Sequence, residues 1–239
     1  MKSRVDLYSS KNKPKNYKLY IVIISVLLVF LIIYFGIKQY NSYLINKYSV
    51  RGVLVSQSDG YIDFVSLANN DQKFVYIKAS QGSTYTDNNF SNNFNRSQGS
   101  GMQIGVYHVF STQSKIKSQL SNFTRAVGPN YGSIPPMVFV NSTLNNLQKD
   151  QLSKFVYMIH RYYNTNLVIN CNNDIFNYLH KKNPYTSLLS NNLNNSKATF
   201  VSIYDHSINL DGSNISLNQL AFNGKNTDWE RYLLKSRNR

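Results

Sequence analysis

The chain has 239 residues, of which 42% are hydrophobic and 14% aromatic, so it can build a packed core and global disorder is not expected. Lys and Arg number 26 against 11 Asp and Glu, and the net charge of +15 suits anionic partners or simple solubility. The single cysteine, Cys171, cannot form a disulfide within the chain, and no CxxC or HExxH spacing occurs, so we expect no metal or other cofactor.

The chain opens with a basic segment, residues 1–18, which carries six Lys or Arg residues against one Asp. An uncharged apolar run follows from Leu19 to Ile37. A run of about 19 residues at about 1.5 Å each matches the roughly 30 Å hydrocarbon core of a membrane. Because positive charge concentrates before the run, we expect the N-terminus in the cytoplasm and residues 38–239 outside the cell membrane.

A cleaved signal peptide is the alternative interpretation of this apolar run. Such a peptide has a shorter apolar stretch and a small-x-small cleavage site, and none follows Tyr34 at the end of the run. We therefore expect an uncleaved signal anchor, a transmembrane helix over residues 19–37, with residues 38–50 as a stalk.

From Val53 onward, short apolar runs typical of strands alternate with patterns typical of amphipathic helices. The expected strands lie at residues 53–55, 74–77, 103–107, 137–140, 167–169 and 200–203. The expected helices lie at residues 63–68, 88–95, 116–127, 144–159 and 175–180. Residues 191–197 read as a polar loop. The basic tail, residues 223–239, is expected as a short surface helix or as a segment that touches anionic polymer or membrane.

This alternation predicts an α/β fold with a parallel sheet, either a closed β/α barrel or, as second choice, an open doubly wound sheet. No Gly-rich phosphate-binding motif follows the first strand, which weakens the open sheet of nucleotide-binding proteins. In a barrel, the functional groups lie at the carboxyl ends of the strands.

Four motifs in order carry a family resemblance. They are Arg51-Gly-Val-Leu-Val-Ser-Gln-Ser-Asp-Gly-Tyr-Ile-Asp-Phe64, Phe74-Val-Tyr-Ile-Lys-Ala-Ser-Gln-Gly82, Tyr85-Thr-Asp-Asn-Asn-Phe90 and Ile104-Gly-Val-Tyr-His-Val109. Over residues 51–222 the chain resembles the family-25 glycoside hydrolases, the N-acetylmuramidase lysozymes that cut peptidoglycan. The resemblance implies an irregular, flattened, TIM-like β/α barrel after the transmembrane helix.

The acidic positions of this family are occupied by other residues. The resemblance places Leu54 at the first Asp, Phe139 and Asn141 at a D-x-E pair on the fourth strand, and Ser216 at a late Asp. Glycoside hydrolysis needs a carboxylic acid and usually a second carboxylate. An asparagine side chain cannot deliver a proton near neutral pH, so we expect no catalytic residue at these positions.

Four other aspartates lie near expected strand ends: Asp59, Asp63, Asp87 and Asp205. We expect Asp63 to cap the first helix and Asp87 to be structural. Among the four, Asp205, with His206 beside it, is the candidate for a relocated acid. The serines Ser56, Ser58 and Ser142 could in principle pair with His108. A Ser–His pair needs spatial proof and a third orienting group, so we set that arrangement aside.

Amide and phenol groups at the strand ends suit sugar hydroxyls and acetamides, and the expected substrate-binding residues are Tyr107, Asn141, Gln81, Gln57 and Tyr85. The leading hypothesis is a membrane-anchored, lysozyme-like pseudoenzyme that binds peptidoglycan or another wall glycan, or that scaffolds envelope proteins. The alternatives are an active muramidase with relocated acids and a pure protein-interaction module. A nucleic-acid partner is not expected, because the basic domain is expected outside the cell.

Overall fold

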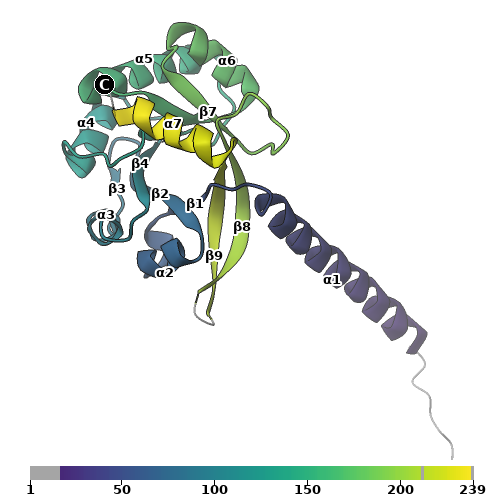
Figure 1. The fold of residues 1–239 in the computed structure, drawn as a ribbon. Coiled ribbons are helices and arrows are strands. Elements are labelled where there is room, and N and C mark those ends of the chain that lie inside the picture. Colours follow the sequence, from purple (N-terminus) through teal and green to yellow (C-terminus); the bar gives the residue numbers. More distant parts are fainter. Residues whose placement is uncertain (1–16, 211–212, 238–239) are drawn as a thin grey trace, which may run out of the picture. The chain divides into compact units, whose positions relative to one another are not determined.

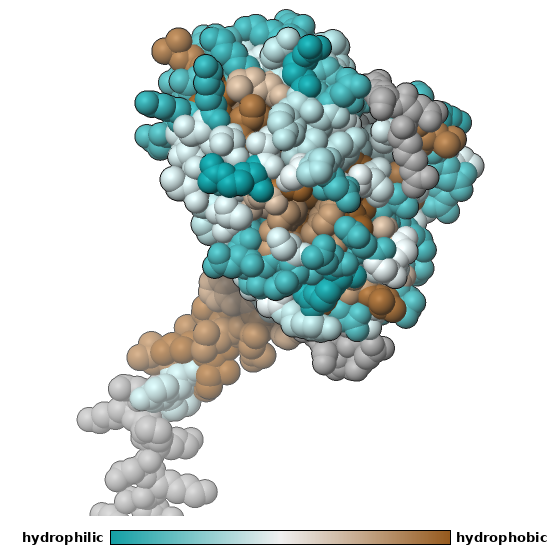
Figure 2. Space-filling view, turned by 90° about the vertical axis from the view of Figure 1, so that its left-hand side faces the viewer, coloured by the Kyte–Doolittle hydropathy of each residue, from teal (hydrophilic) through white to brown (hydrophobic). Residues whose placement is uncertain are grey.

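The computed structural model describes residues 17–210 and 213–237 (Figure 1). It divides into two units, the first ending at Asn41 and the second starting at Ser42. Helix α1 (Tyr17–Ile45) is apolar and exposed over its span Tyr17–Ile37, whose mean hydropathy is 2.9. Figure 2 shows the surface of this helix in brown, the colour of hydrophobic residues. Its length and composition suit a membrane span or a signal sequence.

The second unit alternates strands and helices, as the periodicity predicts. Its strands are β1 (Arg51–Val55), β2 (Gln72–Gln81), β3 (Tyr85–Thr86), β4 (Gln103–Val109), β5 (Met137–Phe139), β6 (Leu167–Asn170), β7 (Thr186–Ser190), β8 (Phe200–Leu210) and β9 (Ser213–Phe222). Its helices are η1 (Gln57–Asp59), α2 (Phe64–Asn69), α3 (Phe90–Ser97), α4 (Ile116–Val127), α5 (Asn146–Tyr163), α6 (Asn173–Lys182) and α7 (Asn226–Arg237).

The strands close into a barrel, which confirms the first choice of fold over the open sheet. The sheet order is β1-β9-β8-β7-β6-β5-β4-β2-β3, and a further pairing of β1 with β2 closes the ring of eight strands, with β3 attached to the edge of β2. Strands β1, β2 and β4 to β8 run parallel, whereas β9 runs antiparallel between β8 and β1.

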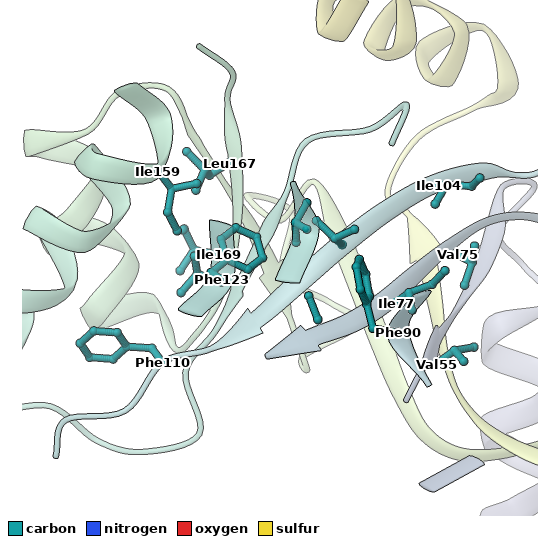
Figure 3. Packing of buried hydrophobic residues seen from close by; sticks show 14 of the residues in the cluster. Val55, Val75, Ile77, Phe90, Ile104, Phe110, Phe123, Ile159, Leu167 and Ile169 are labelled. Atoms are coloured by element: carbon teal, nitrogen blue, oxygen red, sulfur yellow. The ribbon is translucent and has the colours of Figure 1, made fainter. Parts of the chain in front are cut away.

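The barrel has two apolar layers, because neighbouring residues of a strand face opposite sides of the sheet. The outer layer packs strand residues such as Val55, Ile77 and Ile169 against the helices, with Phe123 of α4 and Ile159 of α5 among its members (Figure 3). The inner layer fills the barrel with large side chains, many of them aromatic. Its fully buried members include Phe74, Tyr76, Met137, Val168, Leu189, Phe200 and Leu220.

The segment expected as a basic tail contains α7, which closes the amino-terminal end of the barrel. Trp229 is 7% exposed, and its ring lies 5.3 Å from Phe74 and 5.2 Å from Phe222, centroid to centroid. Phe74 lies near the start of β2, and Phe222 ends the antiparallel β9, so both mark the end of the barrel opposite the expected site. The expected site at the carboxyl ends of the parallel strands is therefore left open by this helix.

Candidate functional site

The mouth of the barrel is formed where the parallel strands end, and its floor is apolar on one side. Leu54 on β1 is 5% exposed and belongs to the inner layer together with Tyr107 on β4. Phe139 at the end of β5 is half-buried and packs on the same layer. The structure thus brings together two of the positions that the resemblance assigns to acids, Leu54 and Phe139, and both present hydrocarbon.

Tyr107 lies in this floor with its ring 5.9 Å from the ring of Phe139, centroid to centroid. Burial raises the pKa of the Tyr107 phenol, and the nearby carboxylates of Asp59 and Asp87 raise it further. The phenol therefore stays protonated at physiological pH, and it can act as a hydrogen-bond donor or acceptor to a bound molecule.

The two carboxylates near Tyr107 are engaged by the loop that follows β1. Asp59 Oδ2 accepts hydrogen bonds from the Ser56 backbone N–H at 2.7 Å and from the Ser56 hydroxyl at 3.0 Å. Asp87 is 3% exposed, and its two oxygens accept the backbone N–H groups of Gln57 at 2.9 Å and Asn89 at 3.0 Å. These contacts give both carboxylates a structural role, as expected for Asp87.

Lys78 of β2 is a cation at the mouth that the sequence did not single out as a site residue. The inward-facing residues Phe74 and Tyr76 precede it on β2 at intervals of two, and this alternation points Lys78 inward as well. Its Nζ donates to Gln81 Oε1 at 3.1 Å and lies 4.8 Å from the centroid of the Tyr85 ring. Burial lowers the pKa of Lys78, and Asp87 partly offsets that effect.

Gln81 and Tyr85 are thus brought together with Lys78 at the mouth. Gln57 differs, because its side-chain oxygen accepts the backbone N–H of Asn88 at 2.8 Å. Its backbone N–H also donates to Asp87, so Gln57 ties the loop after β1 to the segment before α3. The structure therefore gives Gln57 a structural contact that its sequence position did not reveal.

Asn141 lies on the other side of the mouth, in a pocket of about 450 Å³ at the ends of β5, β6 and β7. The pocket lining is Val140, Asn141, Ser142, Thr143, Asn170, Cys171, Asn172, Asn173, Ser190, Asn191 and Asn192. These residues offer amides, hydroxyls and one thiol but no ionised group, since burial raises the pKa of Cys171 to about 12. The chemistry of the pocket suits a neutral polar ligand.

A layer of polar side chains lies on top of the apolar barrel interior, next to this pocket. Asn170 Nδ2 donates to Asn191 Oδ1 at 3.3 Å, and the Ser202 hydroxyl donates to the same oxygen at 2.7 Å. Asn170 follows the inward-facing Val168 of β6 by two positions. In the same way Asn191 follows Leu189 of β7, and Ser202 follows Phe200 of β8. This spacing was the signal in the sequence that could have identified Asn170 and Asn191 as site residues.

Ser216 and Asp205 are two further candidates from the sequence. Ser216 on β9 is exposed and pairs in register with Ser207 of β8, which places it on the long β8–β9 hairpin. Asp205, the candidate for a relocated acid, lies on β8, but its side chain is outside the described residues.

His108 faces the outer layer of the barrel and does not reach the mouth. Its Nδ1 is 2.8 Å from the Ser80 hydroxyl and its Nε2 is 3.3 Å from Gln119 Oε1. The ring is fully buried, and burial lowers the pKa of His108 to about 4. These contacts occupy both ring nitrogens, so the arrangement with Ser56, Ser58 or Ser142 is not formed.

Comparison with known proteins is consistent with this geometry. The family model described as glycosyl hydrolases family 25 matches residues 53–206. The chain is 32% identical over 59 residues to the autolytic lysozyme of Clostridium acetobutylicum and 37% identical over 59 residues to lysozyme M1 of Streptomyces globisporus. Each match covers 25% of this chain but 18% and 20% of those proteins, so the chain spans a fifth or less of their length in these matches.

Solved structures extend the similarity to the whole barrel. The family 25 glycosyl hydrolase from Bacillus anthracis superimposes with a TM-score of 0.67 at 24% identity, covering 78% of this chain and 94% of that chain. The bacterial lysozyme from Streptomyces coelicolor superimposes with a TM-score of 0.62 at 20% identity, covering 80% of this chain and 98% of that chain. At these identities the superpositions establish a shared fold.

Proposed function

Because this chain belongs to glycosyl hydrolase family 25, we propose that it is a lysozyme-like, membrane-anchored pseudoenzyme that binds cell-wall glycan without cleaving it. The related proteins named above are described as lysozymes, and peptidoglycan is the glycan that we propose as the ligand. A scaffold for envelope proteins would be compatible with the same anchored domain.

The observation that carries the proposal is the replacement of the acids. Leu54, Phe139, Asn141 and Ser216 stand at the four positions that the family resemblance assigns to carboxylates. A missing general acid typically costs a factor of about 10² to 10⁴ in rate, and a missing second carboxylate adds to that loss. The floor formed by Leu54 and Phe139 would also disfavour a cationic transition state, because burial next to hydrocarbon penalises charge.

Nearby carboxylates do not offer a ready replacement in the described residues. Asp59 and Asp87 accept backbone N–H groups, which hold their carboxyl groups in place within the loop. A general acid must be within reach of the leaving oxygen. The contacts of Asp59 and Asp87 therefore support a structural role over catalysis.

Binding groups remain at both sides of the mouth. On one side lie Tyr107, Gln81 and Tyr85 beside the Lys78 cation, and on the other lies Asn141 in the amide-lined pocket. Aromatic rings and amides suit the apolar faces, hydroxyls and acetamides of sugars. We propose that a glycan strand lies across the mouth and contacts both sides.

The proposal places α1 in the cell membrane as an uncleaved signal anchor. The apolar span Tyr17–Ile37 and the basic residues before it support a cytoplasmic N-terminus and an extracytoplasmic barrel. The helix continues to Ile45, so most of the expected stalk, residues 38–50, would extend the anchor as a helix.

A direct test uses the full chain in detergent with purified peptidoglycan and an active muramidase as positive control. We expect the chain to sediment with the insoluble glycan while releasing no reducing ends during long incubation. Turnover that is abolished by Asp205→Ala would instead establish an active enzyme with a relocated acid. Absence of glycan binding, with co-purification of envelope proteins, would favour the protein-interaction module.

A further inference from the structure

A second pocket lies on the flank of the barrel, between the turn after η1 and helix α3. It has a volume of about 500 Å³ and is lined by Gly60, Tyr61, Asn89, Asn92, Asn95 and Arg96. None of these residues belongs to the candidate groups at the barrel mouth. The lining combines one exposed phenol ring, three amides and one guanidinium group.

Arg96 is held in a fixed position by three contacts. The guanidinium carbon lies 4.3 Å from the centroid of the Tyr61 ring and 5.7 Å from that of Phe64. Its Nη2 donates to Asn93 Oδ1 at 2.7 Å. A guanidinium stacked on aromatic rings and fixed by a hydrogen bond loses little conformational entropy when it binds a ligand.

Two hydrogen-bond donors beside this pocket lack an acceptor within the described part of the chain. Arg96 Nε is buried without a partner, and so is Nδ2 of Asn93, whose side chain is fully buried. Asn93 Oδ1 already accepts from Arg96, which fixes the orientation of the amide and excludes a flip that would satisfy its Nδ2. Buried donors without partners are costly, and Arg96 is the one of these two side chains that lines the pocket and that a ligand can reach.

Asp63 lies near Arg96: the Ser66 backbone N–H is the main cause that lowers the pKa of the Asp63 carboxyl, and the charge of Arg96 adds a smaller lowering. Its oxygens already accept the Val65 and Ser66 backbone N–H groups and the Ser66 hydroxyl, all at the start of α2. No salt bridge joins Asp63 to Arg96 among the ion pairs of the described residues. The guanidinium therefore keeps positive charge available to a ligand.

We propose that this flank pocket binds an oxyanion, phosphate or carboxylate, carried on a sugar or polyol. The Arg96 guanidinium offers the charged N–H groups that such an anion accepts, and the three amides can bond neighbouring hydroxyls. Tyr61 is 76% exposed, so one face of its ring stays open to the apolar face of a sugar while the other side meets Arg96. Residues 19–239 carry 20 Lys or Arg against 10 Asp or Glu, and this positive charge would favour the approach of an anionic polymer.

The test is calorimetric titration of the full chain in detergent with glucose 6-phosphate, glucose, inorganic phosphate and a poly(glycerol phosphate). We expect glucose 6-phosphate to bind at least about tenfold more tightly than glucose or phosphate alone, because both the anion and the ring contribute. Tight binding of the polymer would identify a phosphate-bearing polyol chain as the source, whereas binding of the sugar phosphate alone would identify a phosphorylated sugar.

Two variants and a matched control locate the site. Arg96→Gln should weaken glucose 6-phosphate at least about tenfold, and Tyr61→Ala should remove its advantage over inorganic phosphate. Arg125→Gln, at an exposed arginine on α4, should change neither. Equal binding of glucose and glucose 6-phosphate, unchanged affinity in Arg96→Gln, or no binding by any probe up to about 10 mM would overturn the proposal.

A spectroscopic measurement decides the matter if Arg96→Gln fails to fold. The Nε–Hε resonance of Arg96 in the unmutated chain should shift on addition of glucose 6-phosphate and stay in place with glucose. An unshifted resonance at saturating sugar phosphate would overturn the proposal. The outcome is separate from glycan binding at the barrel mouth, because the two sites share no residue.

Discussion

The ring of Tyr107 lies against the ring of Phe139, with 5.9 Å between centroids and an angle of 44° between the planes. Tyr107 is in register with Met137 on the neighbouring strand, so Phe139 is the next inward-facing residue of β5. A carboxylate at position 139 would sit in the same place, next to a phenol that can hydrogen-bond. The pair therefore shows that an aromatic contact occupies the space that the family resemblance assigns to an acid.

Restoring the carboxylates should create hydrolysis if their loss is what prevents it. We expect the variant Leu54→Asp, Phe139→Asp, Asn141→Glu, Ser216→Asp to release reducing ends from peptidoglycan at a rate at least about a hundredfold above the unmutated chain. The matched control carries Asn141→Gln in place of Asn141→Glu, which keeps the size of the side chain but supplies no proton. A folded quadruple variant with no more activity than this control would contradict the explanation.

Acid should destabilise the domain through His108. The folded-state pKa of His108 is about 4 and lies below the ordinary value of 6.5, so the unfolded chain takes up the proton first as pH falls. Above about pH 6.5 the neutral ring makes its full contribution to the free energy of unfolding. That free energy decreases by roughly 3 kcal/mol as the pH falls to about 4. The measurement is urea unfolding of the full chain in detergent across this range.

The variant His108→Gln separates this effect from the titration of carboxylates. It lacks the ionisable ring, so its free energy of unfolding should depend less on pH between about 6.5 and 4. Parallel pH profiles for the two proteins would show that His108 does not cause the loss.

Asp63 should stabilise the start of α2. Its Oδ1 accepts the backbone N–H groups of Val65 and Ser66, each at 3.0 Å. We expect Asp63→Ala to cost about 1 kcal/mol in the free energy of unfolding, and Asp63→Asn to cost less because asparagine is also a favourable cap. Equal losses in the two variants, measured by chemical unfolding, would argue against capping.

Closure of the barrel by α7 should depend on Trp229. Its ring packs on Phe74 and Phe222 of the inner layer, and we expect Trp229→Ala to cost about 3 to 5 kcal/mol. Leu234 on the same helix is 60% exposed, so Leu234→Ala should change stability by less than about 0.5 kcal/mol. Similar melting temperatures for the two variants would show that α7 does not close the barrel in solution.

Several strands and helices were predictable because their apolar residues follow a clear period. The helix over residues 116–127 was expected with the bounds that the structure has, since its apolar stripe ends at Val127 and Gly128 follows as a stop. Strand β7 (Thr186–Ser190) was missed, because its short mixture of Thr, Ser and Leu carries no strong alternation. The pairing of β9 with β1 joins residues 164 to 170 positions apart, which no local pattern encodes.

The sequence by itself determined the apolar segment, the alternation of strands and helices and the residues at the family's acid positions, because these follow from hydrophobic period and from the order of motifs. Only the tertiary structure decided what each polar side chain contacts. It tied Gln57, Asp59 and Asp87 to backbone groups, buried His108 in the outer layer and brought Arg96 onto Tyr61. The physical reason is that hydrogen bonds and ring contacts depend on distances between elements, and packing sets those distances after local structure has formed.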